Sequence, residues 1–156
     1  MMTADDIRQS GETEISSEQA ADQMLLYAFD QAVEMLEAGE GFDPFTILLK
    51  DDEFFIEDHP EDTIEECTAS ARNTIRQMAL VASDYVFVYD GYVELDEGPS
   101  DAIIVERAHA GDEEGEVFAM LYEEHGDHLH FDETLYGIGN APNYFAETDD
   151  SRDGDA

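Results

Sequence analysis

The stretch that decides the fold is 84–95, which reads DYVFVYDGYVEL. Aromatic residues alternate with valines at its start, and this period of two is typical of a β-strand. The same register continues through Gly91 to Val93 and Leu95, so the pattern predicts one long strand with a kink at the glycine. A tight hairpin with Asp90 and Gly91 at its turn is the alternative.

Three further strands are predicted after the long one, at 101–108, 116–123 and 128–136, separated by acidic loops that contain glycine. Connections this short cannot hold the crossover helices of a parallel sheet, so the strands are expected to form an antiparallel meander. The segment that follows, 136–145, carries too few glycines for a dinucleotide-binding loop. We interpret it as a loop that tucks Tyr144 and Phe145 against the body.

Two helical patterns lie upstream of the long strand. Apolar residues recur at spacings of three and four over 17–38 and over about 61–82, where Thr63 and Glu66 match a capping box. Between these patterns, 45–49 and 53–57 predict a hairpin with a polar turn. The elements together predict an α+β fold in which two helices pack on a mostly antiparallel, meander-like sheet of about six strands.

Length and composition favour a single domain. A chain of 156 residues, of which 42% are hydrophobic, is long enough to bury one core. We predict a flexible acidic arm at 1–14, one α+β domain at 15–146 and a disordered acidic tail at 147–156. The single cysteine, Cys67, excludes an intramolecular disulfide and is expected to be buried on the second helix.

The charge balance excludes two classes of partner. The chain has 6 Lys and Arg against 41 Asp and Glu, which gives a formal net charge of −35. A surface this negative is repelled by nucleic acid and by anionic membranes. The N-terminus lacks the cationic and apolar regions of a secretory signal, so a cytoplasmic location is expected. In composition the chain resembles proteins of halophilic microbes, which implies that its acids serve solubility in concentrated salt.

Two predicted strands carry apolar residues on both faces, at 102–105 and 117–122. We expect two helices to cover only one face of the sheet, so something else must bury the other face. The first segment of the chain, a bent sheet that closes on itself, and a second subunit packing sheet to sheet are the alternatives. We favour the second subunit and therefore predict a homodimer.

The clearest chemical cluster is HGDHLHFD at 125–132. On a strand, His128, His130 and Asp132 project from one face, and together with His125 they are candidate ligands for Zn²⁺ or another divalent ion. Successive same-face residues lie nearly 7 Å apart on a strand, so a tetrahedral site needs a further ligand from another element. The alternative is a solvated polar strand face beside a turn.

Arg72 and Arg76 are two of the few cations and lie four residues apart on the second predicted helix. Guanidinium groups bind carboxylates and phosphates through paired hydrogen bonds, so these arginines are a candidate anion clamp. The alternative is that they contact carboxylates of the protein's own acidic surface.

The sequence contains no phosphate-binding loop, nucleophile elbow, paired CxxC or calcium loop. We therefore expect a non-catalytic domain that needs no cofactor and acts by binding or self-association. The histidine cluster supports an alternative function as a divalent-metal-binding protein or metal-dependent enzyme. A further alternative is an acidic mimic of DNA that binds a basic protein partner.

Overall fold

A computed structural model describes residues 17–39 and 41–146 of the chain. The predicted α+β class is confirmed, because these residues form two helices and one seven-stranded sheet. The predicted arm at 1–14 and tail at 147–156 lie outside the described residues. The elements in chain order are α1 (Ser17–Glu37), β2 (Phe45–Lys50), β3 (Glu53–Asp58), α2 (Ile64–Gln77), β4 (Asp84–Leu95), β5 (Gly98–His109), β6 (Glu114–His125), β7 (His128–Phe131) and β8 (Tyr136–Pro142).

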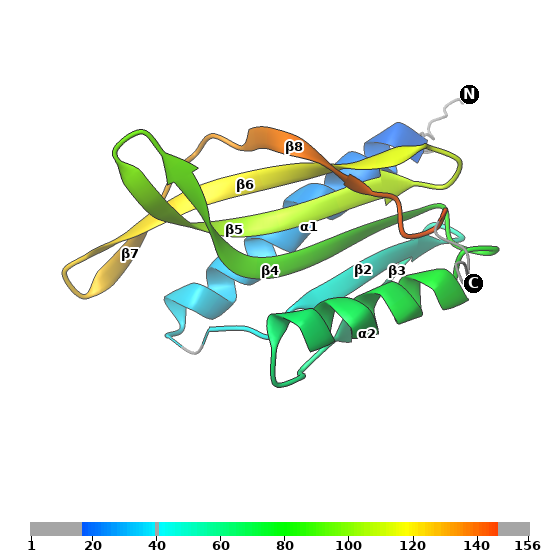
Figure 1. The fold of residues 1–156 in the computed structure, drawn as a ribbon, viewed down its shortest axis with the longest axis horizontal. Helices are drawn as coiled ribbons and strands as arrows, with labels where there is room; N and C mark the ends of the chain where they lie inside the picture. The colour runs from blue at the N-terminus through cyan, green and yellow to red at the C-terminus, as the bar shows by residue number, and fades with distance from the viewer. Residues whose placement is uncertain (1–16, 40, 147–156) are drawn as a thin grey trace, which may run out of the picture.

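The strands pair in the order β3-β2-β4-β5-β6, and both β7 and β8 pair with the outer edge of β6 (Figure 1). Every pair is antiparallel, and β4, β5 and β6 follow one another along the chain as the predicted meander. β2 pairs with β4 across the connection that contains α2. No helix in the described part of the chain is long and apolar enough to cross a membrane.

The predictions for the first helix and for the hairpin are confirmed in position. α1, β2 and β3 begin and end within one or two residues of their predicted bounds. The Thr63 hydroxyl caps α2 by accepting a hydrogen bond from the backbone N–H of Glu66 at 3.1 Å. α2 ends at Gln77, earlier than predicted, and the chain continues in turns to residue 81.

The prediction of one long strand is confirmed, because β4 pairs with β5 along its whole length. The Asp90-Gly91 hairpin turn does not occur. A Cβ atom on Gly91 would lie 3.2 Å from Cγ1 of Ile104 on the neighbouring strand. The glycine therefore allows the two strands to pack closely at this point.

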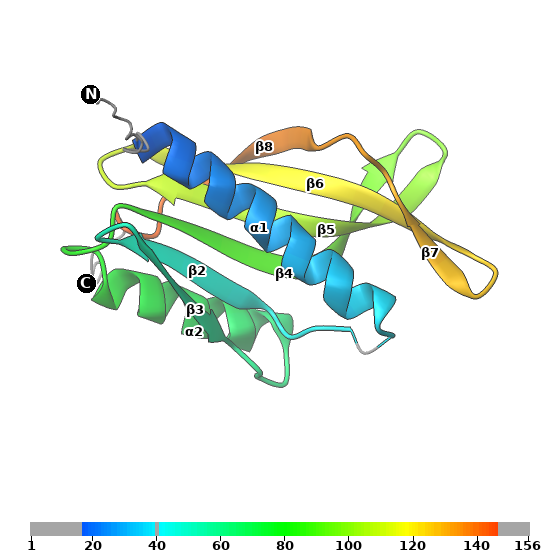
Figure 2. The same ribbon diagram turned by 180° about the vertical axis from the view of Figure 1, so that it is seen from behind.

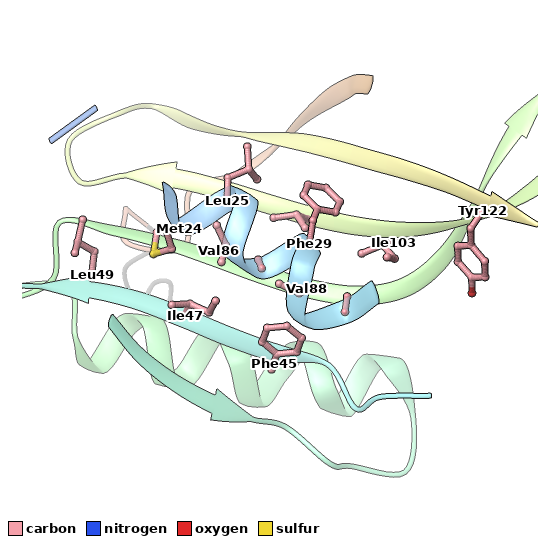
Figure 3. Close-up of a cluster of buried hydrophobic side chains, with 13 residues drawn as sticks. Met24, Leu25, Phe29, Phe45, Ile47, Leu49, Val86, Val88, Ile103 and Tyr122 are labelled. Carbon is pink, nitrogen blue, oxygen red and sulfur yellow. The ribbon is translucent and has the colours of Figure 1, made fainter. Parts of the chain in front are cut away.

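The two helices cover opposite faces of the sheet, as the two views show (Figures 1 and 2). α1 packs on the face that carries Val86 and Val88, and α2 packs on the face that carries Tyr85 and Phe87. Successive residues of a strand point to opposite faces, so each half of the alternation needs its own cover. The expectation that both helices share one face is therefore wrong. The core on the α1 side comprises Met24, Leu25, Ala28, Phe29, Ala32, Phe45, Ile47, Leu49, Val86, Val88, Ile103, Val105 and Tyr122 (Figure 3).

The sheet area beyond α2 is covered by side chains of the chain itself. Ala102, Ile104 and Ala119 are buried there, although neither of the two described helices lies over β5 and β6 on this side (Figure 1). Their cover is provided by partly buried neighbours, namely Tyr89, Val93, Val117 and Leu121. The apolar strand residues from which a sheet-to-sheet dimer was predicted are thus largely buried within one chain.

The segment predicted to be a loop contains a strand, β8, which pairs with 114–119 of β6 through a β-bulge. The sequence pattern does not indicate this strand, because Gly137 and Gly139 have no side chains and so break the alternation of apolar and polar residues. Strand pairing itself depends on backbone hydrogen bonds, which glycine can form. β7 is correspondingly shorter than its predicted strand. The expected tucking of Tyr144 is confirmed, since this residue is buried and its N–H donates to the Tyr85 hydroxyl at 2.9 Å. Phe145 packs against the same cluster.

Candidate functional site

The three histidines of the predicted metal site lie together at the β6–β7 hairpin. His125 is paired with His128, and His130 lies opposite Glu123. The rings of His125 and His130 stack with their centroids 5.4 Å apart, and the ring of His128 lies 6.2 Å from that of His125. The Nε2 atom of His125 is 3.0 Å from the Glu123 carboxylate. The hairpin therefore gathers the imidazoles on one surface.

Asp132 does not join this group. Its carboxylate accepts hydrogen bonds from the backbone N–H of Thr134 at 3.0 Å and from the Tyr136 hydroxyl at 3.3 Å. Across residues 17–39 and 41–146, no group of three or more His, Cys, Asp or Glu side chains is arranged to hold a metal ion. Metal binding at this hairpin thus stays a prediction from the sequence.

The two arginines of the candidate clamp have different surroundings. The Arg72 guanidinium lies 5.2 Å from the centroid of the Tyr144 ring, whereas Arg76 is exposed in the last turn of α2. The Tyr144 and Tyr89 hydroxyls donate to the two oxygens of Glu106 at 2.9 and 2.7 Å. Burial and the Glu106 charge raise the pKa of both tyrosines, so both remain hydrogen-bond donors. Arg72 therefore belongs to a cluster with Tyr89, Glu106 and Tyr144, which packs the segment after β8 against α2 and the sheet.

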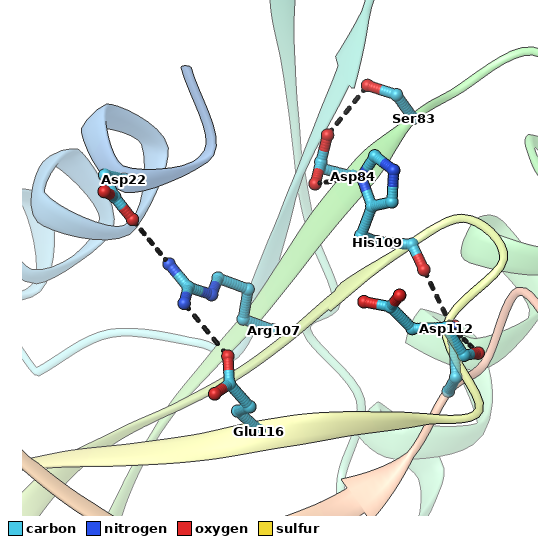
Figure 4. A network of polar contacts seen from close by, with 8 residues as sticks. Asp22, Ser83, Asp84, Arg107, His109, Asp112 and Glu116 are labelled. Atoms are coloured by element: carbon cyan, nitrogen blue, oxygen red, sulfur yellow. Dashed lines mark hydrogen bonds and ion pairs between the residues drawn. The ribbon is translucent and has the colours of Figure 1, made fainter. Parts of the chain in front are cut away.

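A polar network that the sequence analysis did not predict lies where β4 begins and β5 ends (Figure 4). The Asp84 side chain is only 2% exposed, and its carboxylate accepts a hydrogen bond from the Ser83 hydroxyl at 2.8 Å. Its other oxygen lies 2.9 Å from Nδ1 of His109. Asp84 and His109 are direct cross-strand partners in the β4–β5 register. A two-residue turn at 96–97 pairs Leu95 with Gly98, and the same register extended along both strands pairs Asp84 with His109. The turn is therefore the sequence signal from which this pair could have been predicted.

Arg107 lies near this pair and extends the polar network to α1 and β6. Its guanidinium donates to Asp22 of α1 at 3.0 Å and to Glu116 of β6 at 2.9 Å (Figure 4). The same group lies 5.0 Å from the centroid of the Phe118 ring. One cation thus joins α1 to two strands and offsets two of the surface acids.

A histidine held by a buried carboxylate is an arrangement that supports general-base catalysis. The open depression next to His109 has a volume of about 340 Å³. None of the described residues that line it is a Ser, Thr, Cys, Lys or Tyr, so a nucleophile activated by His109 there would be a water molecule. The lining residues are Ala21, Asp22, Asp84, Arg107, Ala108, His109, Asp112, Glu114 and Glu116. The contacts of the network join β4 to β5 through Asp84 and His109, and link α1 and β6 through Arg107.

His59 is a second polar residue whose role the sequence analysis missed. Its side chain is completely buried, with Nε2 3.0 Å from the Thr46 hydroxyl and Nδ1 2.9 Å from the Ser70 hydroxyl. Burial lowers the pKa of His59, and the nearby acids Glu57, Asp58 and Glu61 only partly oppose this effect. The neutral ring therefore connects β2 to α2. Cys67 is also buried on α2, as expected.

Exposed apolar side chains gather at β3, which is the strand at one edge of the sheet. Phe54, Phe55 and Ile56 are 39%, 43% and 50% exposed, respectively. Tyr27 of α1 is 36% exposed and stacks on Phe54, with ring centroids 6.3 Å apart. We call these four residues the β3 surface. The other exposed large apolar residues among those described lie on α1, α2, β4 and β8 and in the turns after α2.

The β3 surface has two faces. Phe54 and Ile56 pair with the β2 residues Leu49 and Ile47, whose side chains belong to the core under α1. Phe55 pairs with Leu48, which packs against α2. Apolar groups therefore flank the free edge of β3 on both sides of the sheet.

Comparison with known proteins identifies no relative. No family model matches the chain, and no curated protein and no solved structure is significantly similar to it.

Proposed function

We propose that this protein is a non-catalytic domain that acts by self-association, and that two copies meet at the β3 surface. The observation that carries this proposal is an edge strand with three adjacent large apolar side chains exposed. Soluble proteins usually protect such edges with proline, charged side chains (above all lysine), a β-bulge or a covering element. β3 reads EFFIED and pairs with β2 residue by residue, so it has no proline, lysine or β-bulge. Its acidic residues lie at the two ends of the strand and leave Phe54, Phe55 and Ile56 at the centre without a charge.

The size of the β3 surface indicates a reversible association. A fully exposed aromatic side chain offers roughly 200 Å², so the four side chains together leave about 300 Å² per copy. Even with the backbone included, an interface built on this surface falls below the roughly 1,200 Å² of standard stable complexes. We therefore expect a dimer whose population depends on protein concentration.

The direct test is the molar mass of the purified full chain in molar KCl, measured by sedimentation across a wide concentration range. We expect the mass to rise toward that of a dimer as concentration increases. The double variant Phe54→Thr/Ile56→Thr should stay monomeric, because it removes the apolar contact. Threonine is β-branched and favoured in strands, so β3 itself should still form. A wild-type protein that is monomeric at every concentration would contradict the proposal.

A matched control is available on the other exposed edge strand, β8. Tyr136 and Ile138 are exposed to a similar extent as the β3 residues. The double variant Tyr136→Thr/Ile138→Thr should leave the association unchanged. If it abolishes the dimer as effectively as the β3 variant does, the β3 surface is not the contact.

The metal-binding and DNA-mimic functions stay predictions from the sequence. Elemental analysis of tag-free protein tests the first, and capture of basic proteins that is lost in high salt tests the second.

A further inference from the structure

We propose that the two copies join by pairing β3 with β3 of the second copy, antiparallel and about a two-fold axis that passes through Phe55. This inference rests on the proposed self-association and specifies its geometry. The result is one continuous sheet that spans both copies, with the two α1 helices on the same face.

The hairpin register identifies which backbone groups of β3 are available. The backbone N–H of His59 donates to the carbonyl of Pro44 at 2.8 Å, which continues the β2–β3 ladder beyond β3. Hydrogen-bonded pairs alternate along an antiparallel ladder, so Glu57, Phe55 and Glu53 also direct their backbone groups toward β2. Phe54 and Ile56 lie between them and direct their N–H and C=O groups to the free edge.

A two-fold axis at Phe55 places Phe54 opposite Ile56 of the second copy. Both residues direct their backbone groups outward, so the two symmetric pairs satisfy all four N–H and C=O groups of Phe54 and Ile56 on each copy. Moving the axis to Phe54 would place Ile56 opposite Asp52, and moving it to Ile56 would place Phe54 opposite Asp58. Of these three registers, only the one centred on Phe55 puts each of Phe54, Phe55 and Ile56 opposite an apolar residue.

The side chains on each face match in this register. On the α1 face, Phe54 and its stacked neighbour Tyr27 meet Ile56 of the second copy. On the α2 face, Phe55 meets its own symmetry mate. Because β3 supplies both halves of each contact, the partner that fits it is a second copy of the chain.

The charges around this centre point to a dependence on salt. The register places Glu53 opposite Glu57 of the second copy at both ends of the apolar centre, which is a repulsive pair. Lys50, the only lysine in the chain, is the cross-strand neighbour of Glu53, and its Nζ lies 6.0 Å from the centroid of the Phe55 ring. One lysine per pair of glutamates reduces the repulsion without cancelling it. The dimer should therefore strengthen as KCl screens the remaining charge.

The test uses a cysteine on the two-fold axis. Phe55→Cys in a Cys67→Ser background forms a non-hydrogen-bonded pair with its own copy, where Cα atoms are about 4.5 Å apart and a disulfide can close. We expect a disulfide-linked dimer under mild oxidation in molar KCl. The matched control is Phe54→Cys in the same background, since residue 54 is similarly exposed but lies diagonally from its own symmetry mate, beyond disulfide reach.

The outcomes separate this inference from the proposed function. If the wild-type chain dimerises but Phe54→Cys links as readily as Phe55→Cys, the register is wrong and self-association stands. If the wild-type chain is monomeric but binds an added peptide strand flanked by lysines, a basic strand is the partner and both proposals are wrong.

A second measurement needs no cysteine. Exchange of the Phe54 and Ile56 backbone amides should slow as wild-type concentration rises in molar KCl, because pairing protects them. Exchange that is fast at every concentration in a proven dimer would overturn the strand pairing. The variant Lys50→Glu should weaken the dimer and make it more dependent on salt, whereas association unaffected by this change contradicts the assigned charge pairs.

Discussion

At the scale of single residues, buried polar side chains join parts of the chain that are distant in sequence. His59 has a hydroxyl on each side of its ring, from Thr46 and Ser70. Asp84 has a hydroxyl and an imidazole partner. A buried polar group without a partner costs about 1–3 kcal/mol, so these contacts matter most for what their loss would leave unsatisfied.

The first residue-scale prediction concerns pH. Burial lowers the pKa of His59 in the folded state, whereas the ordinary pKa of a histidine, 6.5, applies in the unfolded chain. Below about pH 6.5 the unfolded chain therefore binds more protons at this residue than the folded protein does. The contribution of His59 to stability is therefore fully present above about pH 6.5 and is lost progressively as the pH falls toward its lowered folded pKa. Urea unfolding between pH 7.5 and 5.5 at constant KCl should show this decrease.

The variant His59→Gln should be less stable at pH 7.5 by about 1–3 kcal/mol, because it leaves buried hydroxyls poorly paired. It should also lose the His59 part of the pH dependence. His128→Gln is the control, since His128 lies exposed at the β6–β7 turn and its replacement should leave the stability at pH 7.5 unchanged. An unchanged pH dependence in His59→Gln would show that the buried ring does not titrate as described.

At the scale of elements, the strongly periodic segments were predicted correctly. The turn of the β2–β3 hairpin is a place where the backbone is strained. Its turn residues Asp51 and Asp52 have φ angles of 53° and 65°. Both angles are positive, as a two-residue turn that matches the twist of the strands requires. Glycine adopts such angles at little cost, whereas a residue with a Cβ atom pays a steric penalty.

We predict that Asp52→Gly stabilises the protein by about 1 kcal/mol, because it relieves the left-handed conformation at the second turn position. Asp52→Ala removes the same charge but keeps the Cβ atom, so it should give no gain or a loss. Thermal unfolding of the two variants beside the wild type measures the difference. Equal stabilisation by both substitutions would mean that charge repulsion, and not backbone conformation, limits the turn.

At the scale of the whole molecule, the net charge of −35 opposes compaction. Local compensation exists, for example where Arg107 contacts Asp22 and Glu116, but six cations cannot offset 41 acids. Electrostatic repulsion acts over about 10 Å at 0.1 M salt and about 3 Å at 1 M. The folded state should therefore depend on the salt concentration of its surroundings.

The melting temperature should rise steeply between dilute buffer and molar KCl, because screening relieves repulsion that is stronger in the compact state than in the unfolded chain. Sucrose at matched osmolality is the control, since it does not screen charge and should raise the melting temperature less. A melting temperature that is indifferent to KCl would remove the assignment of the acidic surface to a salt-rich environment.

The sequence by itself determined the α+β class, the long strand β4, the short hairpin and the approximate positions of both helices, because these depend on local periodicity and turn residues. Tertiary structure decided the rest. It placed the helices on opposite faces and paired β8 with β6, and backbone hydrogen bonding drives that pairing without a side-chain signal. It also brought Asp84 to His109, enclosed His59 between two hydroxyls and left β3 at the edge of the sheet. Such contacts depend on strand order and burial, which join residues too far apart for any local pattern to connect.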